Sequence, residues 1–180
     1  MKVLGILGSL RKESLNRKLL QAAVNLGPEG VDIEIFDRVG EFPIFNDDLA
    51  GDPPPVVSEF KQRVRAADAI LFVSPEYNHS IPGGLKNTID WGSRPSSDNC
   101  FNDKPAAIMG AGDGMGGTVR MQPHLRQVML DLNMHTINDE LLVREGASKF
   151  DGRGILIDEK TRMAVTAHLA ALAAWTQKLR

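Results

Sequence analysis

The chain has 180 residues, of which 42% are hydrophobic and 24% are charged, and its formal net charge at pH 7 is −2. These values predict one folded domain over residues 1–180 and exclude a disordered or fibrous chain. They also give no strongly basic surface for nucleic acid, and no apolar run approaches the roughly 20 residues of a membrane span.

Strand-like and helix-like segments alternate along the chain, which predicts an α/β fold. In chain order we expect a strand at 2–7, a helix at 15–26, a strand at 31–36, a helix at 54–67, a strand at 69–74, a helix at 83–92, a strand at 105–110, a helix at 118–132, a strand at 134–142 and a helix at 158–179. The helix at 118–132 would place Val119 and Leu125 inward, and the glycine-containing segment 144–157 resembles a mobile connector.

The five predicted strands form a parallel sheet with helices on both faces, a three-layer sandwich. Right-handed crossovers allow two common strand orders, and in the order 2-1-3-4-5 the first, third and fourth strands are adjacent and central. The alternating strand at 31–36 then lies at an edge of the sheet. The loops after the three central strands can converge on a single site.

The loop after the first strand carries Ser9, Arg11, Ser14 and Asn16 just where a helix begins. A helix start presents unpaired N–H groups and a partial positive charge, so this loop can hold a phosphate. The alternative is that Ser14 only caps the helix and Arg11 lies in solvent.

The loop after the third strand contains two prolines and one aromatic ring between Ser74 and Gly83. The backbone N–H groups of Glu76, Tyr77 and Asn78 can face the nitrogens and carbonyls of a heterocycle, a composition typical of cofactor sites. The alternatives are a rigid connection into the next helix, and a buried general acid at Glu76.

The loop after the fourth strand contains a Gly-x-Gly-x-x-Gly pattern at Gly112, Gly114 and Gly117. The pattern lies late in the chain, and no strand-ending acid follows about 20 residues on, which argues against a dinucleotide fingerprint. We interpret this loop as a flexible wall that lets a ring and a second substrate approach the backbone.

No catalytic residue of the chain itself is predicted. The four histidines are scattered without acid partners at metal-ligand spacing, so we expect no metal site, and the single cysteine, Cys100, resembles a loop thiol. One cysteine and no expected signal peptide are typical of a cytoplasmic protein. We therefore expect a bound cofactor to carry the chemistry. The loop after the first strand suits a phosphate and the loop after the third strand suits a ring, so together they predict a mononucleotide.

Two segments, Gly8–Asn16 and Pro75–Trp91, resemble motifs of the NAD(P)H-dependent FMN reductase family, especially its chromate and quinone reductase branch. The resemblance extends over about residues 1–140 and implies a flavodoxin-like fold, noncovalent FMN, and homodimers or homotetramers. It implies a phosphate site in the first loop, a site for the isoalloxazine in the second, and a flanking wall in the third. The implied FMN-binding residues are Ser9, Arg11, Ser14, Asn16, Pro75, Glu76, Tyr77, Asn78, Ile81, Gly112, Asp113, Gly114 and Gly117.

The chain departs from that family at two places. Asp113 puts a negative charge near the expected ring, which would make reduction harder or shape the choice of acceptor. Pro123 stands where close relatives tend to carry Tyr in their tetramer contacts, and leaves Arg120, Arg126 and Glu140 as polar interface candidates.

We therefore expect hydride to pass from NADH or NADPH to bound FMN and on to a quinone, free flavin, an azo dye or an oxidised metal ion. A flavodoxin-type electron carrier and a non-enzymatic sensor that has kept the fold are the alternatives. The sequence shows no basic cluster that marks a 2′-phosphate site, so it indicates no preference between the two nicotinamides.

Overall fold

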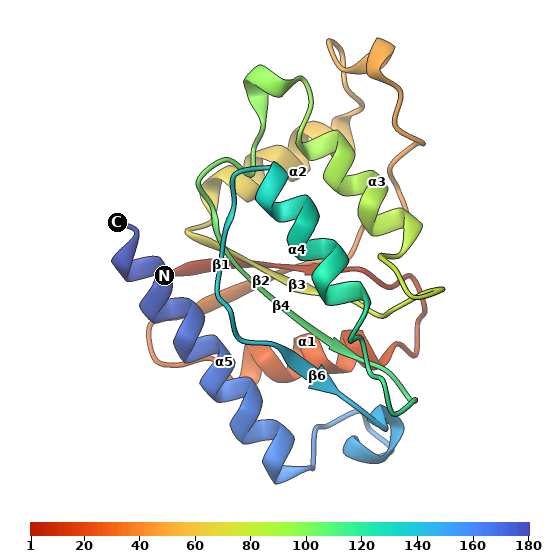
Figure 1. Ribbon diagram of the computed structural model, residues 1–180, viewed down its shortest axis with the longest axis vertical. Coiled ribbons are helices and arrows are strands. Elements are labelled where there is room, and N and C mark those ends of the chain that lie inside the picture. Colours follow the sequence, from red (N-terminus) through yellow and green to blue (C-terminus); the bar gives the residue numbers. More distant parts are fainter.

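The computed structural model describes residues 1–180 and contains one sheet of parallel strands (Figure 1). The strands are β1 (Lys2–Leu7), β2 (Asp32–Phe36), β3 (Ala69–Val73), β4 (Pro105–Ala111), β5 (His135–Thr136) and β6 (Leu141–Val143). They form one sheet in the order β2-β1-β3-β4-β5, in which β6 also pairs with β4. The predicted α/β class and strand order are confirmed, and β2 is an edge strand as expected.

The last predicted strand, at 134–142, is wrong as a single element. Only its two ends pair with β4, as β5 and β6. Between them the polar segment Asn138-Asp139-Glu140 leaves the sheet, and Arg126 donates to the Ile137 carbonyl at 2.6 Å and to the Asp139 carbonyl at 2.9 Å. Arg126 therefore bonds within its own chain, and its role as an interface residue stays a prediction.

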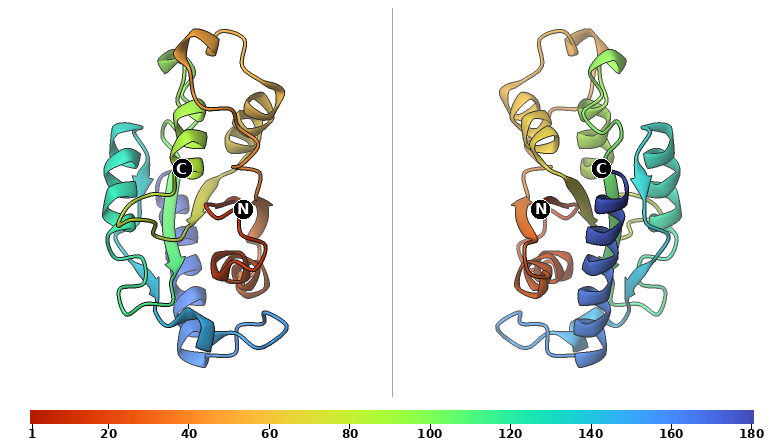
Figure 2. Two further views of the ribbon diagram at one scale, coloured as in Figure 1. Left: turned by 90° about the vertical axis from the view of Figure 1, so that its right-hand side faces the viewer. Right: turned by 90° about the vertical axis from the view of Figure 1, so that its left-hand side faces the viewer.

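Helices cover both faces of the sheet. They are α1 (Leu15–Leu26), α2 (Pro55–Ala66), α3 (Gly83–Gly92), α4 (Met121–Asp131) and α5 (Glu159–Lys178), with 3-10 turns η1 (Asp47–Leu49), η2 (Ser96–Asp98) and η3 (Gly146–Lys149). Figure 2 shows α1 and α4 on opposite sides of the sheet. One buried cluster joins α1 and α5 to the sheet, and the other joins α2, α3 and α4 to its opposite face. No helix combines the length and the apolar content needed to cross a bilayer.

Helix α4 begins three residues later than the sequence pattern predicts. Gly117 has a φ of 57°, which turns the chain before the helix, and Val119 lies 38% exposed in that turn instead of inside. The late start places Pro123 in the first turn of α4, where its missing N–H removes no helical hydrogen bond.

The connector 144–157 is structured, contrary to the sequence pattern. It contains η3 and a bridge between Phe150 and Leu156, which are both buried. Trp91 is 1% exposed, and its indole N–H donates to the Pro43 carbonyl at 2.8 Å. It therefore packs within its own chain.

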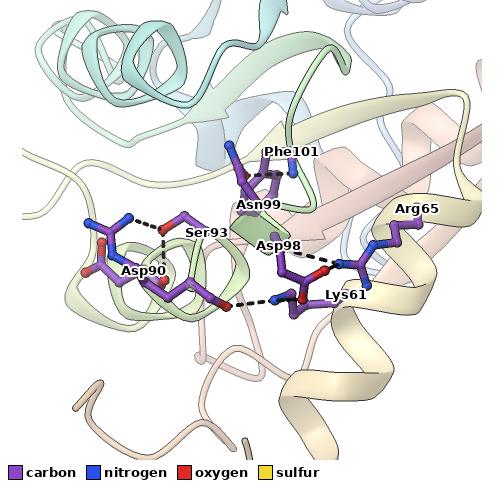
Figure 3. A network of polar contacts seen from close by, with 8 residues as sticks. Lys61, Arg65, Asp90, Ser93, Asp98, Asn99 and Phe101 are labelled. Carbon is purple, nitrogen blue, oxygen red and sulfur yellow. Dashed lines mark hydrogen bonds and ion pairs between the residues drawn. The ribbon is translucent and has the colours of Figure 1, made fainter. Parts of the chain in front are cut away.

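An ionic network fastens α2 to the segment after α3, at the end of the sheet where β4 begins (Figure 3). Lys61, whose side chain is 5% exposed, donates to the Arg94 carbonyl at 2.7 Å and to Asp98 at 2.5 Å, and Arg65 also pairs with Asp98. Cys100 next to it lies in a loop, as the sequence indicates, but it is buried, and burial raises its pKa to about 12.

Candidate functional site

The loops that follow β1, β3 and β4 meet at the carboxyl ends of these strands, at the right of Figure 1. They enclose a cavity of about 150 Å³, here called the three-loop hollow. Because the three strands are adjacent in the sheet, segments far apart in the sequence supply one site. The lining residues are Ser9, Arg11, Ser14, Leu15, Asn16, Pro75, Glu76, Tyr77, Ala111, Gly112, Asp113 and Gly117.

The first loop presents an array of hydrogen-bond donors at the start of α1. The Ser14 hydroxyl oxygen accepts from the Asn16 and Arg17 amides at 3.2 and 3.4 Å, so Ser14 does cap the helix. The backbone amides of residues 12–15 donate to no acceptor within the chain, and the Arg11 guanidinium has no partner. Capping and anion binding are therefore compatible here, because Ser14 satisfies later amides and leaves the earlier ones free.

Asn16 makes structural contacts that its motif did not indicate. Its side-chain amide donates to the Ala111 carbonyl and accepts from the Ala111 amide, both at 2.9 Å, and both residues are 2% exposed. The side-chain oxygen and one of the two side-chain N–H groups are thus used within the chain, and the phosphate role of Asn16 stays a prediction. Asn16 clamps the start of α1 to the end of β4, and so joins the first loop to the third.

The second loop turns on two residues in left-handed backbone conformation. Tyr77 and Ser80 exchange backbone hydrogen bonds at 3.1 and 3.0 Å, and between them Asn78 and His79 have φ values of 49° and 63°. This is the geometry of a tight hairpin turn. The Tyr77 amide is therefore engaged, whereas the amides of Glu76 and Asn78 have no acceptor within the chain. The Tyr77 side chain lies 44% exposed at the rim of the hollow.

Glu76 caps α4. One carboxylate oxygen accepts from the backbone amides of Arg120 and Met121 at 2.8 and 3.0 Å, and the other lies 3.3 Å from His79. Burial alone would raise the pKa of Glu76, but these hydrogen bonds outweigh it and lower the pKa below its ordinary value. A carboxylate held in its ionised form does not suit the general-acid alternative.

The third loop is tied to η3. Asp113 accepts from the Ala147 amide at 2.9 Å, and the Gly112 carbonyl accepts from the Gly146 amide at 3.0 Å. The Asp113 charge is thus anchored on a neighbouring amide. A Cβ at Gly112 would approach the Gly117 carbonyl oxygen to 2.9 Å, so the tight loop requires glycine there.

Three expected site residues lie outside the lining. Asn78 forms the hairpin turn, the half-buried Ile81 packs against the core under α2, α3 and α4, and Gly114 has open space around it. The sequence interpretation missed Leu15 and Ala111, which line the hollow. It also did not single out Leu10, Met115 and Val119, which expose apolar side chains on the first and third loops. Their loop positions are readable from the sequence, but their exposure is not.

Known proteins resemble the chain over its whole length. The profile of the family described as NADPH-dependent FMN reductase matches residues 1–148. An NAD(P)H-dependent FMN reductase of Pseudomonas aeruginosa is 47% identical over 182 residues, which cover 100% of this chain and 97% of that protein. An NAD(P)H:quinone oxidoreductase of Solanum tuberosum is 46% identical, covering 100% of this chain and 95% of that protein.

Solved structures agree with the fold. The structure of FerB, a flavoenzyme NAD(P)H:(acceptor) oxidoreductase from Paracoccus denitrificans, aligns with a TM-score of 0.91 and 34% identity over 98% of this chain and 97% of that one. A flavodoxin from Pseudomonas aeruginosa aligns with a TM-score of 0.63 and 16% identity over 96% of this chain and 99% of that one, which supports the flavodoxin-like fold alone.

Proposed function

The chain belongs to the NADPH-dependent FMN reductase family, and we propose that it passes hydride from NADH or NADPH, through FMN bound at the three-loop hollow, to a small-molecule acceptor. One observation carries the assignment of the site. The hollow gathers, in a single place, the donor array of the first loop, the turn of the second and the glycines of the third.

The first loop fits the phosphate of FMN. Its free amides, the unpaired Arg11 guanidinium, and the 1% and 3% exposed hydroxyls of Ser9 and Ser14 all offer donors toward one small cavity. At about 150 Å³ the cavity is smaller than the roughly 300 Å³ at which whole-ligand sites begin. We therefore place only the phosphate end in the hollow and the flavin ring against its open rim.

The second and third loops fit the ring. The unengaged amides of Glu76 and Asn78 are donors for ring carbonyls and nitrogens, and the Tyr77 side chain offers an aromatic edge. When bound, FMN supplies the chemistry of accepting and donating hydride. The chain contributes by fixing the ring and leaving one approach open, so its share of the rate is proximity and orientation.

Exposed apolar side chains on the three loops favour flat organic acceptors. Leu10, Tyr77, Met115 and Val119 expose apolar surface on the loops that form the hollow, which suits a quinone ring better than a hydrated metal ion. We therefore propose quinones as the main acceptors, and free flavin, azo dyes and oxidised metal ions such as chromate as further acceptors to be tested.

A test of this function begins with the visible spectrum of the purified protein, followed by anaerobic titration with NADH and NADPH and then by quinone. We expect a flavin spectrum that bleaches with the nicotinamide and recovers with the quinone. A flavin that nicotinamide does not bleach would identify an electron carrier. A colourless protein that FMN cannot reconstitute would identify a non-enzymatic relative. In this assay Tyr77→Ala should lose turnover with little change in melting temperature, and Tyr77→Phe should keep both.

We also propose that the chain forms a homodimer or homotetramer in the cytoplasm. A groove of about 590 Å³ runs between α3 and α4, and Leu130 beside it is 79% exposed. Lys86, Asp90, Arg94 and Asp131 line this groove, so it carries both signs of charge and can face a second copy of itself. Light scattering should give a multiple of 19.7 kDa, and Leu130→Glu should lower it. A wild-type mass of one chain would refute the assembly.

A further inference from the structure

Three basic side chains come together beside the three-loop hollow, at the second loop and the start of α4. Nη1 of Arg120 lies 3.1 Å from Nδ1 of His79, and Nδ1 of His124 lies 3.1 Å from the Ser80 hydroxyl. Arg120 and His124 are four residues apart and therefore lie on one face of the helix start. We call His79, Arg120 and His124 the basic cluster.

The donors of the basic cluster are largely unused. The Arg120 side chain is 57% exposed and contacts His79 and Glu76 only through Nη1, so Nη2 and Nε have no acceptor within the chain. The His79 side chain is 71% exposed. The neighbouring carboxylate, Glu76, is offset by the two α4 amides that it accepts from and by the positive end of the helix. A free guanidinium edge beside two imidazoles is suited to a phosphate, which arginine binds through two parallel hydrogen bonds.

The backbone at His79 adds a second observation. Its φ of 63° lies in the left-handed region, at the second central position of a hairpin turn where glycine is preferred. A non-glycine residue in this region carries backbone strain. The strained turn holds the imidazole against Arg120 at the edge of the site.

The basic cluster lies close enough to the hollow for one ligand to contact both. Glu76 and Tyr77 border the hollow, and His79 follows within the same turn. A nicotinamide that stacks on a ring at the rim carries its pyrophosphate, and in NADPH also a 2′-phosphate, away from the stacked rings. These anionic groups then need cations just outside the hollow.

We propose that the basic cluster is the phosphate subsite for the nicotinamide dinucleotide donor. The proposal rests on the proposed function, because it takes the donor to stack at the rim of the three-loop hollow. The cluster recognises phosphate oxygens, and either the 2′-phosphate or the pyrophosphate can supply them.

The test compares Arg120→Gln, Arg120→Lys and His79→Asn with the control Arg180→Gln. Asparagine tolerates the left-handed backbone at position 79, and Arg120→Gln leaves the backbone amide that Glu76 accepts from. Arg180 pairs with Asp68 near the start of β3, at the opposite end of the sheet. Steady-state kinetics with NADPH and NADH give KM and kcat, and calorimetry measures binding of adenosine 2′,5′-bisphosphate and of ADP to the holoenzyme.

We expect Arg120→Gln to raise KM about 10-fold with kcat unchanged, since a charge-assisted hydrogen bond contributes at least that factor. The KM of Arg120→Lys should lie between those of the wild type and Arg120→Gln. His79→Asn should raise KM by a smaller factor. A loss of affinity confined to NADPH and the bisphosphate would show that the cluster binds the 2′-phosphate. An equal loss of affinity for NADH and ADP would show that it binds the pyrophosphate. Both support the subsite.

Unchanged KM and unchanged calorimetry in Arg120→Gln and His79→Asn would overturn it. A change in the mass of the oligomer without a change in nucleotide binding would also overturn it, because Arg120 would then be a contact between subunits. The flavin content of each variant, read from its absorbance, separates these outcomes from a failure of the proposed function. A wild-type protein that binds no FMN would refute the proposed function, whereas titration of the same bisphosphate into that FMN-free protein would still test the phosphate subsite.

Discussion

Asn16 and Arg11 flank the same hollow, yet their substitution should have opposite consequences. Asn16→Ala removes two 2.9 Å hydrogen bonds to Ala111 inside the protein. Arg11→Ala removes an exposed guanidinium that contacts no other side chain. The pair therefore tests whether Asn16 builds the proposed FMN site while Arg11 contacts FMN directly.

The expected magnitudes follow from these contacts. Each lost hydrogen bond costs about 1 kcal/mol net, and a buried partner left unsatisfied adds about 1 kcal/mol or more, so Asn16→Ala should lower the free energy of unfolding by about 2–4 kcal/mol. Arg11→Ala should change it by less than about 0.5 kcal/mol. For FMN affinity, loss of the charge-assisted contact in Arg11→Ala should weaken binding about 10- to 100-fold.

The assay is urea unfolding of the FMN-free protein, followed by circular dichroism, together with fluorescence titration by FMN. Asn16→Asp serves as a matched control, because it can still accept from the Ala111 amide but cannot donate to the Ala111 carbonyl. It should also destabilise the protein. Wild-type stability in Asn16→Ala, combined with lost FMN affinity, would contradict the clamp and make Asn16 a direct ligand of the phosphate.

Three further changes probe other contacts. Burial lowers the pKa of His168 from 6.5 to about 4, so its contribution is complete above pH 6.5 and up to about 3 kcal/mol is lost as pH falls toward 4. His168→Leu should flatten this acid-side decline in urea unfolding, and an unchanged slope would contradict it. Glu76→Gln should weaken FMN binding several-fold, because the backbone amides of Arg120 and Met121 at the start of α4 lose a charged acceptor that holds the second loop, and equal FMN titration curves would contradict this. Asp98→Asn should lower the free energy of unfolding by about 1–3 kcal/mol, because it leaves the buried Lys61 ammonium without its anion. Lys61→Met in the same chain should restore part of that loss, and a purely additive double variant would refute the pairing.

Local patterns in the sequence determined most of the fold. The helix at 15–26 and the strand at 2–7 have the bounds that their periodicity predicts, and Ser14 caps the helix as its residue type implies. Right-handed crossovers left two common strand orders, and the placement of the three polar loops favoured the order that the structure has. With that order, the three loops after the central strands had to meet.

Side-chain roles at the site depended on partners that are distant in sequence. Asn16 bonds Ala111, 95 residues away, and Glu76 bonds the amides of Arg120 and Met121, 44 and 45 residues away. A motif gives the type of such a residue but not its partner. It therefore does not distinguish a residue that joins two loops from a residue that contacts the cofactor.

The basic cluster shows the same limit. His79 and Arg120 are 41 residues apart and form no run of charge in the sequence, which is why the sequence did not indicate the phosphate subsite that we propose for the nicotinamide donor. Periodicity encodes which face of an element is buried, and it therefore fixes layers and loop positions. Which polar groups meet across those loops is decided only when the sheet brings its carboxyl ends together.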